Sequence, residues 1–110
     1  MLPLTTSLQA TLRERASEDA DFRIALLEYA AESVLAGDLD ETKAVLRGYI
    51  KATIGYKPVA KLVGMHPKSL IRMLGSDGNP CASNLLALLA QTLQLEDIRL
   101  EVRAIPKIVS

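Results

Sequence analysis

Residues 56–74 read Tyr56-Lys-Pro-Val-Ala60-Lys-Leu-Val-Gly64-Met-His-Pro-Lys-Ser-Leu70-Ile-Arg-Met-Leu74 and decide the fold. Apolar residues recur at helical spacing on both sides of Gly64, which predicts two short helices joined by a tight turn. Gly64 can adopt the positive φ that such a turn requires. Ala60 is small enough for the second helix to approach the first closely, and Leu70 points into the angle between them. Ala60, Gly64 and Leu70 are therefore the expected turn and packing positions of a bent helical pair.

The outer face of the second short helix is expected to be polar. Once the apolar positions are assigned to the core, His66, Lys68, Ser69 and Arg72 remain, with Ile71 set aside. Lys68 and Arg72 are four residues apart and therefore share one side of a helix. In a helix-turn-helix protein this side enters the major groove of DNA. We expect His66, Lys68, Ser69 and Arg72 to contact DNA bases.

Charge is divided unevenly along the chain, although the formal net charge is zero. Residues 1–41 carry nine acidic and three basic side chains, whereas residues 42–80 carry seven basic side chains and one acidic side chain. A local basic face attracts a polyanion even when the whole chain is neutral. The alternative is that both charged regions are solvated helix surfaces. The expected contacts with DNA phosphates are Lys57, Lys61, and the backbone around Ser83 and Asn84.

The rest of the sequence is helical in pattern as far as residue 94. We expect helices from Thr5, Thr6 or Ser7 to about Ala16, from Asp19 or Asp21 to Gly37, from Asp38 to Gly55, and from Asn84 to about Gln94 with Ser83 as its N-cap. Asp38 and Glu41 have the spacing of a capping box, and glycine is common directly after a helix. With aromatic residues at only 4%, aliphatic side chains must form the core. The expected core residues around the helical pair are Ala60, Leu62, Val63, Met65, Leu70, Met73, Leu74, Leu85, Leu86 and Leu89.

The period of the pattern changes after the last helix. Ile98, Leu100, Val102 and Ala104 alternate with charged residues, which predicts a short, half-buried β-strand. The predicted fold class is thus all-α, with five to six helices, a repressor-type helix-turn-helix and a short C-terminal β-strand. We divide this compact domain into an acidic helical part (1–37), a helix-turn-helix core (38–95) and a C-terminal strand or tail (96–110).

Signals of enzymatic or metal chemistry are close to absent. The chain has one cysteine, Cys81, and one histidine, His66, too few for a zinc site or a disulfide. The pairs of acidic residues fall at expected helix starts, where the helix dipole favours anions. We predict no catalytic residue, no metal and no cofactor. The sequence also shows neither a leader pattern nor an apolar membrane segment, so we expect a cytoplasmic protein without membrane contact.

Three blocks of sequence resemble one family of regulators: Pro67-Lys-Ser-Leu70-Ile-Arg-Met-Leu74, Asp77-Gly-Asn-Pro80 and Ser83-Asn-Leu-Leu86. They look like the small helix-turn-helix proteins classed with addiction-module antidotes, within the wider phage-repressor (Cro/C1, Xre-like) group. The resemblance extends upstream through Asp21-Phe22-Arg23 and Lys43-Ala-Val-Leu46, and so covers nearly the whole chain. It implies operator binding by the recognition helix, often with neutralisation of a ribonuclease-type toxin. The chain departs from the pattern at His66-Pro67, where a Ser or Thr often opens the recognition helix.

The sequence therefore predicts a sequence-specific DNA-binding regulator of transcription, with residues 67–74 as the recognition helix. One alternative is an antitoxin whose main task is to bind a basic toxin through the acidic residues 1–41, with DNA binding for autoregulation. A helical scaffold without a nucleic-acid role is a third interpretation. Because one recognition helix reads few base pairs, we also expect a homodimer. Pairing of the 98–104 strand between two chains is its expected means, with pairing inside the chain or with another protein as alternatives.

Overall fold

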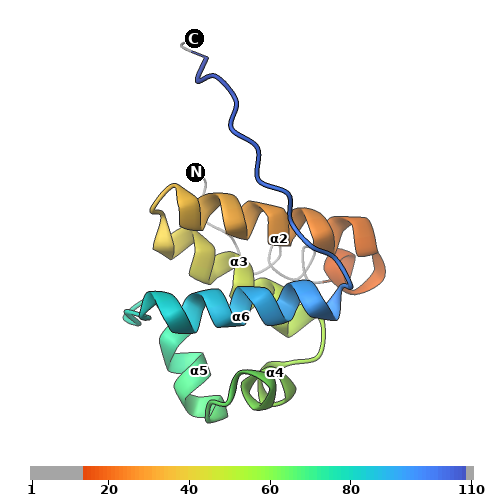
Figure 1. The fold of residues 1–110 in the computed structure, drawn as a ribbon. Coiled ribbons are helices and arrows are strands. Elements are labelled where there is room, and N and C mark those ends of the chain that lie inside the picture. The colour runs from red at the N-terminus through yellow and green to blue at the C-terminus, as the bar shows by residue number, and fades with distance from the viewer. Residues whose placement is uncertain (1–13, 109–110) are drawn as a thin grey trace.

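The structure is a computed structural model that describes residues 14–108. Residues 14–18 are helical and lead into five further helices. These are α2 (Ala20–Leu35), α3 (Leu39–Ala52), α4 (Tyr56–Val63), α5 (Pro67–Leu74) and α6 (Ala82–Leu95). The all-helical prediction is confirmed for this part of the chain. Figure 1 shows α2, α3 and α6 stacked together, with α4 and α5 at the end of the molecule away from α2.

Two aspartates fix the starts of the long N-terminal helices, as the sequence predicts. Asp19 is the N-cap of α2, and its carboxylate accepts a hydrogen bond from the Phe22 N–H at 3.2 Å. Asp38 is the N-cap of α3 and accepts from the Glu41 N–H, also at 3.2 Å. Each carboxylate satisfies an N–H that has no partner within its helix and stabilises the helix by about 1 kcal/mol.

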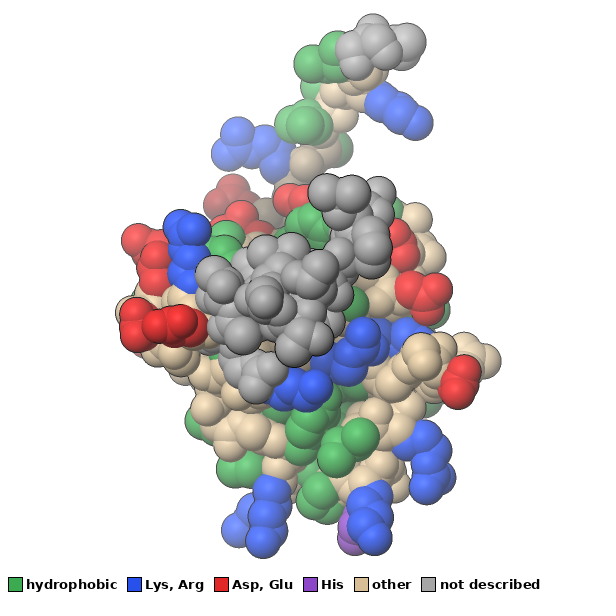
Figure 2. All heavy atoms as spheres, turned by 180° about the vertical axis from the view of Figure 1, so that it is seen from behind, with side chains coloured by type: hydrophobic (Ala, Val, Ile, Leu, Met, Phe, Trp, Pro, Cys, Tyr) green, Lys and Arg blue, Asp and Glu red, His purple; other side chains and the backbone are tan. Residues whose placement is uncertain are grey.

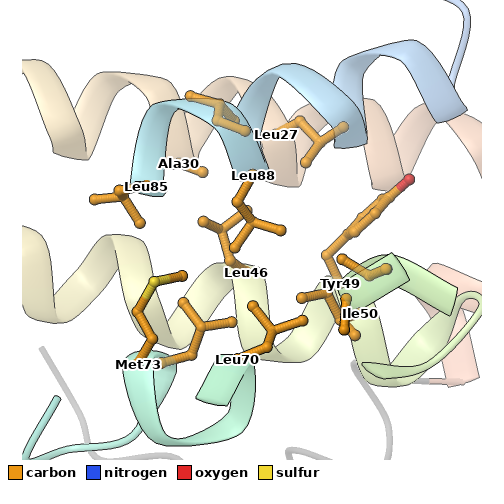
Figure 3. Packing of buried hydrophobic residues seen from close by; sticks show 13 residues of the cluster. Leu27, Ala30, Leu46, Tyr49, Ile50, Leu70, Met73, Leu85 and Leu88 are labelled. Atoms are coloured by element: carbon orange, nitrogen blue, oxygen red, sulfur yellow. The ribbon is translucent and has the colours of Figure 1, made fainter. Parts of the chain in front are cut away.

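A core of aliphatic side chains joins all five of these helices. Figure 3 shows Leu46, Ile50 and Tyr49 of α3 at its centre, between Leu27 of α2 and Leu70 of α5. Each of these five side chains has no solvent exposure. The core residues from the helical pair and α6 are Val59, Ala60, Leu70, Met73, Leu74, Leu85, Leu88 and Leu89. Ridges of these side chains fix how α5 sits on the rest of the molecule.

Buried polar groups in this core are hydrogen-bonded across helices. Ser33 of α2 and Thr42 of α3 are both buried, and their hydroxyl oxygens lie 2.6 Å apart. The Tyr49 hydroxyl donates to the Glu96 carboxylate at 2.5 Å, and the Arg23 guanidinium donates to the same carboxylate at 3.1 Å. Burial and the neighbouring Glu96 carboxylate raise the pKa of Tyr49, so its hydroxyl stays a proton donor. These contacts tie the end of α6 to α2 and α3.

Gly64 ends α4 in the conformation that the sequence predicts. Its φ is +70°, in the left-handed region, and the three residues 64–66 separate α4 from α5. The Met65 N–H donates to the Ala60 carbonyl at 2.9 Å, and the Gly64 N–H to the Lys61 carbonyl at 3.3 Å. This is the hydrogen-bond pattern of a Schellman motif. Ala60 of α4 and Leu70 of α5 are fully buried, and the two helices pack against each other.

Several sequence predictions are wrong in detail. Leu62 and Leu86 are exposed by 46% and 52%, because each lies beside, and not on, the buried stripe of its helix. Val63 and Met65 are half-buried against the core rather than buried in it. Ser83 does not cap α6, since the helix begins at Ala82, two residues before the predicted start, with Cys81 as its N-cap. The first helix, predicted from Thr5, Thr6 or Ser7, begins outside the described residues.

The predicted C-terminal strand is also wrong for this chain. Residues 98–104 form no strand in the described structure. The Ile98 N–H donates to the Leu93 carbonyl, and the chain then runs away from the helices in an irregular, extended path (Figure 1). A strand needs a neighbouring strand for its backbone hydrogen bonds, and the described helices offer none.

Replacing Gly64 tests the left-handed turn. Gly64→Val should lower the free energy of unfolding by about 1–2 kcal/mol or more, because a β-branched residue is strained at positive φ. A Cβ at this position meets no atom within 4 Å, so the backbone conformation alone causes the loss. Gly64→Asn is the matched control, since asparagine tolerates this region better. Thermal unfolding measures both, and an unchanged melting temperature for Gly64→Val would contradict the turn.

Candidate nucleic-acid interface

Basic side chains gather on the end of the molecule that α4 and α5 form. Lys57 and Lys61 lie one helical turn apart on α4, and both are exposed. Figure 2 shows Lys and Arg side chains with the histidine along the lower edge, while Asp and Glu are most frequent in the upper half. Acidic side chains are thus sparse at the lower end of this face, while basic side chains also occur elsewhere on it. Such an arrangement orients the molecule toward a polyanion.

The exposed face of α5 carries the residues that the sequence predicts. Lys68, Ser69 and Arg72 are exposed, while Leu70, Met73 and Leu74 are buried on the opposite side of the helix. Ile71 is also exposed, by 48%. The polar side chains can therefore reach a ligand without any movement of α5. Ile71 therefore adds an apolar side chain to this exposed face, beyond the polar residues that the sequence predicts.

His66 has a structural role at the start of α5. It is the N-cap, and its Nδ1 accepts a hydrogen bond from the Lys68 N–H at 3.2 Å. The imidazole thereby accepts the backbone hydrogen bond that a Ser or Thr side chain commonly accepts at an N-cap. With Nδ1 as acceptor, a neutral ring carries its proton on Nε2, which leaves a donor for an external acceptor. Pro67 follows at the first helical position, where no N–H is needed.

Two basic residues of α3 are used inside the molecule. Lys43 is buried, and its ammonium donates to the Gly75 carbonyl at 3.1 Å and to the Gly78 carbonyl at 2.7 Å. Arg47 donates to the Leu74 carbonyl. These carbonyls belong to the C-terminal end of α5 and the loop that follows, where the helix dipole is negative. Lys43 and Arg47 therefore position α5 and are not part of its exposed basic face.

Gly78 allows the loop after α5 to fold back beneath that helix. A Cβ on Gly78 would lie 2.2 Å from the Met73 carbonyl oxygen and 2.4 Å from the Arg72 carbonyl oxygen. Both distances are below any normal van der Waals contact, so only glycine fits without a backbone shift. The Gly78 N–H also donates to the Gly75 carbonyl at 3.0 Å. The close approach of this loop to α5 gives a steric reason for a glycine in the Asp77-Gly-Asn-Pro80 block.

The start of α6 places the other predicted phosphate contacts. Ser83 and Asn84 are exposed in the first turn of α6, close in sequence to the loop after α5. Helix N-termini present unpaired N–H groups that suit phosphate oxygens. The Cys81 thiol at the N-cap lies 3.3 Å from the Ser83 hydroxyl, and hydrogen bonds from Ser83 and the Asn84 backbone lower the pKa of this thiol.

Comparisons with known proteins add no family to this picture. No family model matches the chain, and neither a curated protein nor a solved structure matches it significantly. Within residues 14–108, no three His, Cys, Asp or Glu side chains are grouped as a metal site requires. None of the helices in this part is both long and apolar enough to span a lipid bilayer.

Replacing Gly78 tests how α5 is held. Gly78→Ala should lower the free energy of unfolding by about 1–3 kcal/mol, because the added methyl group overlaps the carbonyls of α5. Gly48→Ala is the matched control, since Gly48 is exposed in α3 and a Cβ there meets nothing within 4 Å. The control should be neutral or stabilising by up to about 1 kcal/mol. Equal melting temperatures for wild type and Gly78→Ala would contradict the close approach.

Proposed function

We propose that this chain is a sequence-specific DNA-binding regulator of transcription that inserts α5 into the major groove. The observation that carries the proposal is the pair of short helices α4 and α5. A left-handed glycine joins them, and basic residues lie on their exposed side. The resemblance to repressor-type helix-turn-helix regulators supports the same function. Repression at an operator is the form of regulation that this resemblance favours.

The surface divides into two kinds of DNA contact. Lys68, Ser69 and Arg72 on α5, with Nε2 of His66, reach base edges in the proposed complex. Arginine and lysine there suit the O6 and N7 acceptors of guanine. Lys57 and Lys61 of α4, with the first turn of α6, meet the sugar–phosphate backbone on either side of the groove. Phosphate contacts set affinity and orientation, whereas base contacts set the preferred sequence.

Variants of the two classes should separate these roles. Duplexes selected from a random library by the wild-type protein provide the cognate sequence, and unselected duplexes provide the reference. Arg72→Ala should cost about 1–3 kcal/mol on the cognate duplex and relax the preference at one position, with little effect on the reference. Lys57→Ala should weaken binding to both duplexes alike and reduce the salt slope by about one. Fluorescence anisotropy at several salt concentrations measures both effects.

Lys107→Ala is the control, because Lys107 is an exposed basic residue. It belongs to the C-terminal segment after α6, which runs away from α4 and α5 (Figure 1). This variant should leave both affinities unchanged. Equal wild-type affinity for cognate and reference duplexes, or an affinity independent of salt, would contradict the proposal.

A second function is favoured by the face of α2 and the start of α3. Here Tyr29, Leu35 and Leu39 are exposed by 44%, 73% and 38%. Among them lie the exposed carboxylates of Glu28, Glu32, Asp38 and Asp40. Apolar and aromatic anchors with an acidic rim suit a basic protein partner, such as a ribonuclease-type toxin.

The product of an adjacent gene provides the test of this second function. A small basic protein from that gene should bind the wild-type chain and lose at least about 2 kcal/mol of affinity to Tyr29→Ala. Isothermal titration calorimetry gives both values. Ile71→Ala, on the far side of the molecule, should leave this affinity unchanged. Equal binding of wild type and Tyr29→Ala would contradict the second function.

A further inference from the structure

One apolar side chain lies on the exposed face of α5 and outside the core. Ile71 is 48% exposed, and no other large apolar side chain of α5 is exposed. Leu70, Met73 and Leu74 form the buried side of this helix. Isoleucine also favours a helix less than alanine, leucine or lysine does. Neither core packing nor helix formation therefore explains an isoleucine at this position.

The surroundings of Ile71 favour an anionic partner over an apolar one. Lys68 lies three residues before Ile71, which makes the two neighbours on the helix surface. Arg72 follows directly, and both cations are exposed. No acidic residue occurs between Glu41 and Asp77, so the part of the chain that contains α4 and α5 carries only basic charge. An apolar side chain among cations fits a surface that is anionic overall and has isolated apolar groups.

The major groove of DNA is a surface of this kind. Phosphates line both of its sides, and its base edges present hydrogen-bond donors and acceptors. The C5-methyl group of thymine is the one apolar substituent among these base edges. Because an aliphatic side chain forms no hydrogen bonds, this methyl group is the partner in the groove that Ile71 fits.

We propose that Ile71 contacts a thymine methyl group and thereby selects thymine at one position of the bound sequence. This inference rests on the proposed function, since it requires α5 to lie in the major groove. Lys68 and Arg72 are about 6 Å apart along the helix axis, with Ile71 between them. Successive base pairs are about 3.4 Å apart. The thymine therefore lies within about two base pairs of a base that Lys68 or Arg72 contacts.

The rigidity of Ile71 suits it to this contact. A β-branched side chain in a helix keeps one strongly preferred χ1 rotamer. The hydrogen bonds of His66 and Lys43 hold the two ends of α5. The methyl groups of Ile71 are thus presented at a fixed position, and the contact requires little additional ordering when DNA binds.

Removal of the methyl group from the DNA tests the contact directly. In the duplex selected by the wild-type protein, each thymine is replaced in turn by deoxyuridine, which lacks only the C5-methyl group. One replacement should weaken wild-type binding roughly fourfold, as loss of one buried methyl group does. Ile71→Ala should bind the thymine duplex at least roughly fourfold more weakly than the wild type and should not distinguish it from that uracil duplex. Fluorescence anisotropy gives the four affinities, and thermal unfolding shows whether Ile71→Ala folds.

Val102→Ala is the matched control, because it shortens an exposed β-branched side chain in the segment after α6, which runs away from α4 and α5 (Figure 1). This control should respond to uracil as the wild type does. A selected sequence without thymine, or a wild type that no uracil replacement weakens, overturns the thymine contact. An Ile71→Ala variant that loses the same factor as the wild type at every position also overturns it.

The reference duplex separates this failure from failure of the proposed function. If the wild type still prefers the selected duplex and Arg72→Ala relaxes that preference, only the thymine contact is wrong. Equal wild-type affinity for selected and reference duplexes overturns the proposed function and the thymine contact together.

Discussion

The structure depends on how the C-terminal end of α5 is held. The last carbonyls of a helix have no partner inside it, and here they lie against α3 instead of water. Lys43 and Arg47 of α3 donate to the carbonyls of Leu74, Gly75 and Gly78. A buried ammonium group destabilises the fold unless it is fully hydrogen-bonded. The Lys43 ammonium donates to two carbonyls, and the Asp40 carboxylate lies 3.5 Å from it. The end of α5 and the position of α3 are therefore set together.

This constraint gives α5 a fixed direction while its outer face stays free. Leu70, Met73 and Leu74 anchor one side of the helix, and the bonds from α3 anchor its end. The His66 imidazole holds its beginning. The side chains that point outward, Lys68 and Arg72, make none of these contacts. Preorganisation of this kind spares a recognition helix the entropy cost of ordering when it binds. The proposed contacts of α5 with DNA bases require this preorganisation.

Much of the fold follows from local sequence signals. Three features depend only on the residue's own chemistry and its immediate backbone, so the sequence predicts them correctly. These are the N-cap at Asp38, the first-turn position of Pro67 in α5 and the positive φ of Gly64. Burial around α5 also follows from helical periodicity. Leu62 and Leu86 were misassigned because a leucine next to a buried stripe cannot be told from one within it without the neighbouring helices.

The candidate site is less predictable than the fold. The sequence shows that Lys43 and Arg47 are basic. Only their hydrogen bonds to carbonyls at the end of α5 show that both side chains are engaged inside the molecule. The same holds for His66, whose capping role depends on ring orientation, and for Ile71, whose exposure depends on how α5 packs. The alternating pattern of residues 98–104 predicts a strand, but the described helices offer no neighbouring strand to pair with it. The internal use of Lys43 and Arg47 rests on contacts between residues distant in sequence, whereas the His66 cap bonds the Lys68 N–H two residues away.

The most direct measurement of the central claim is an NMR titration of the labelled protein with its selected duplex. The account predicts that amide shift changes concentrate in residues 57–72 and in the first turn of α6, with α2 unaffected. The side-chain signals of Arg72 should broaden or shift on the cognate duplex and stay nearly unchanged on a random one. Shift changes centred on α2 and the start of α3, or none at saturating DNA, would contradict the account.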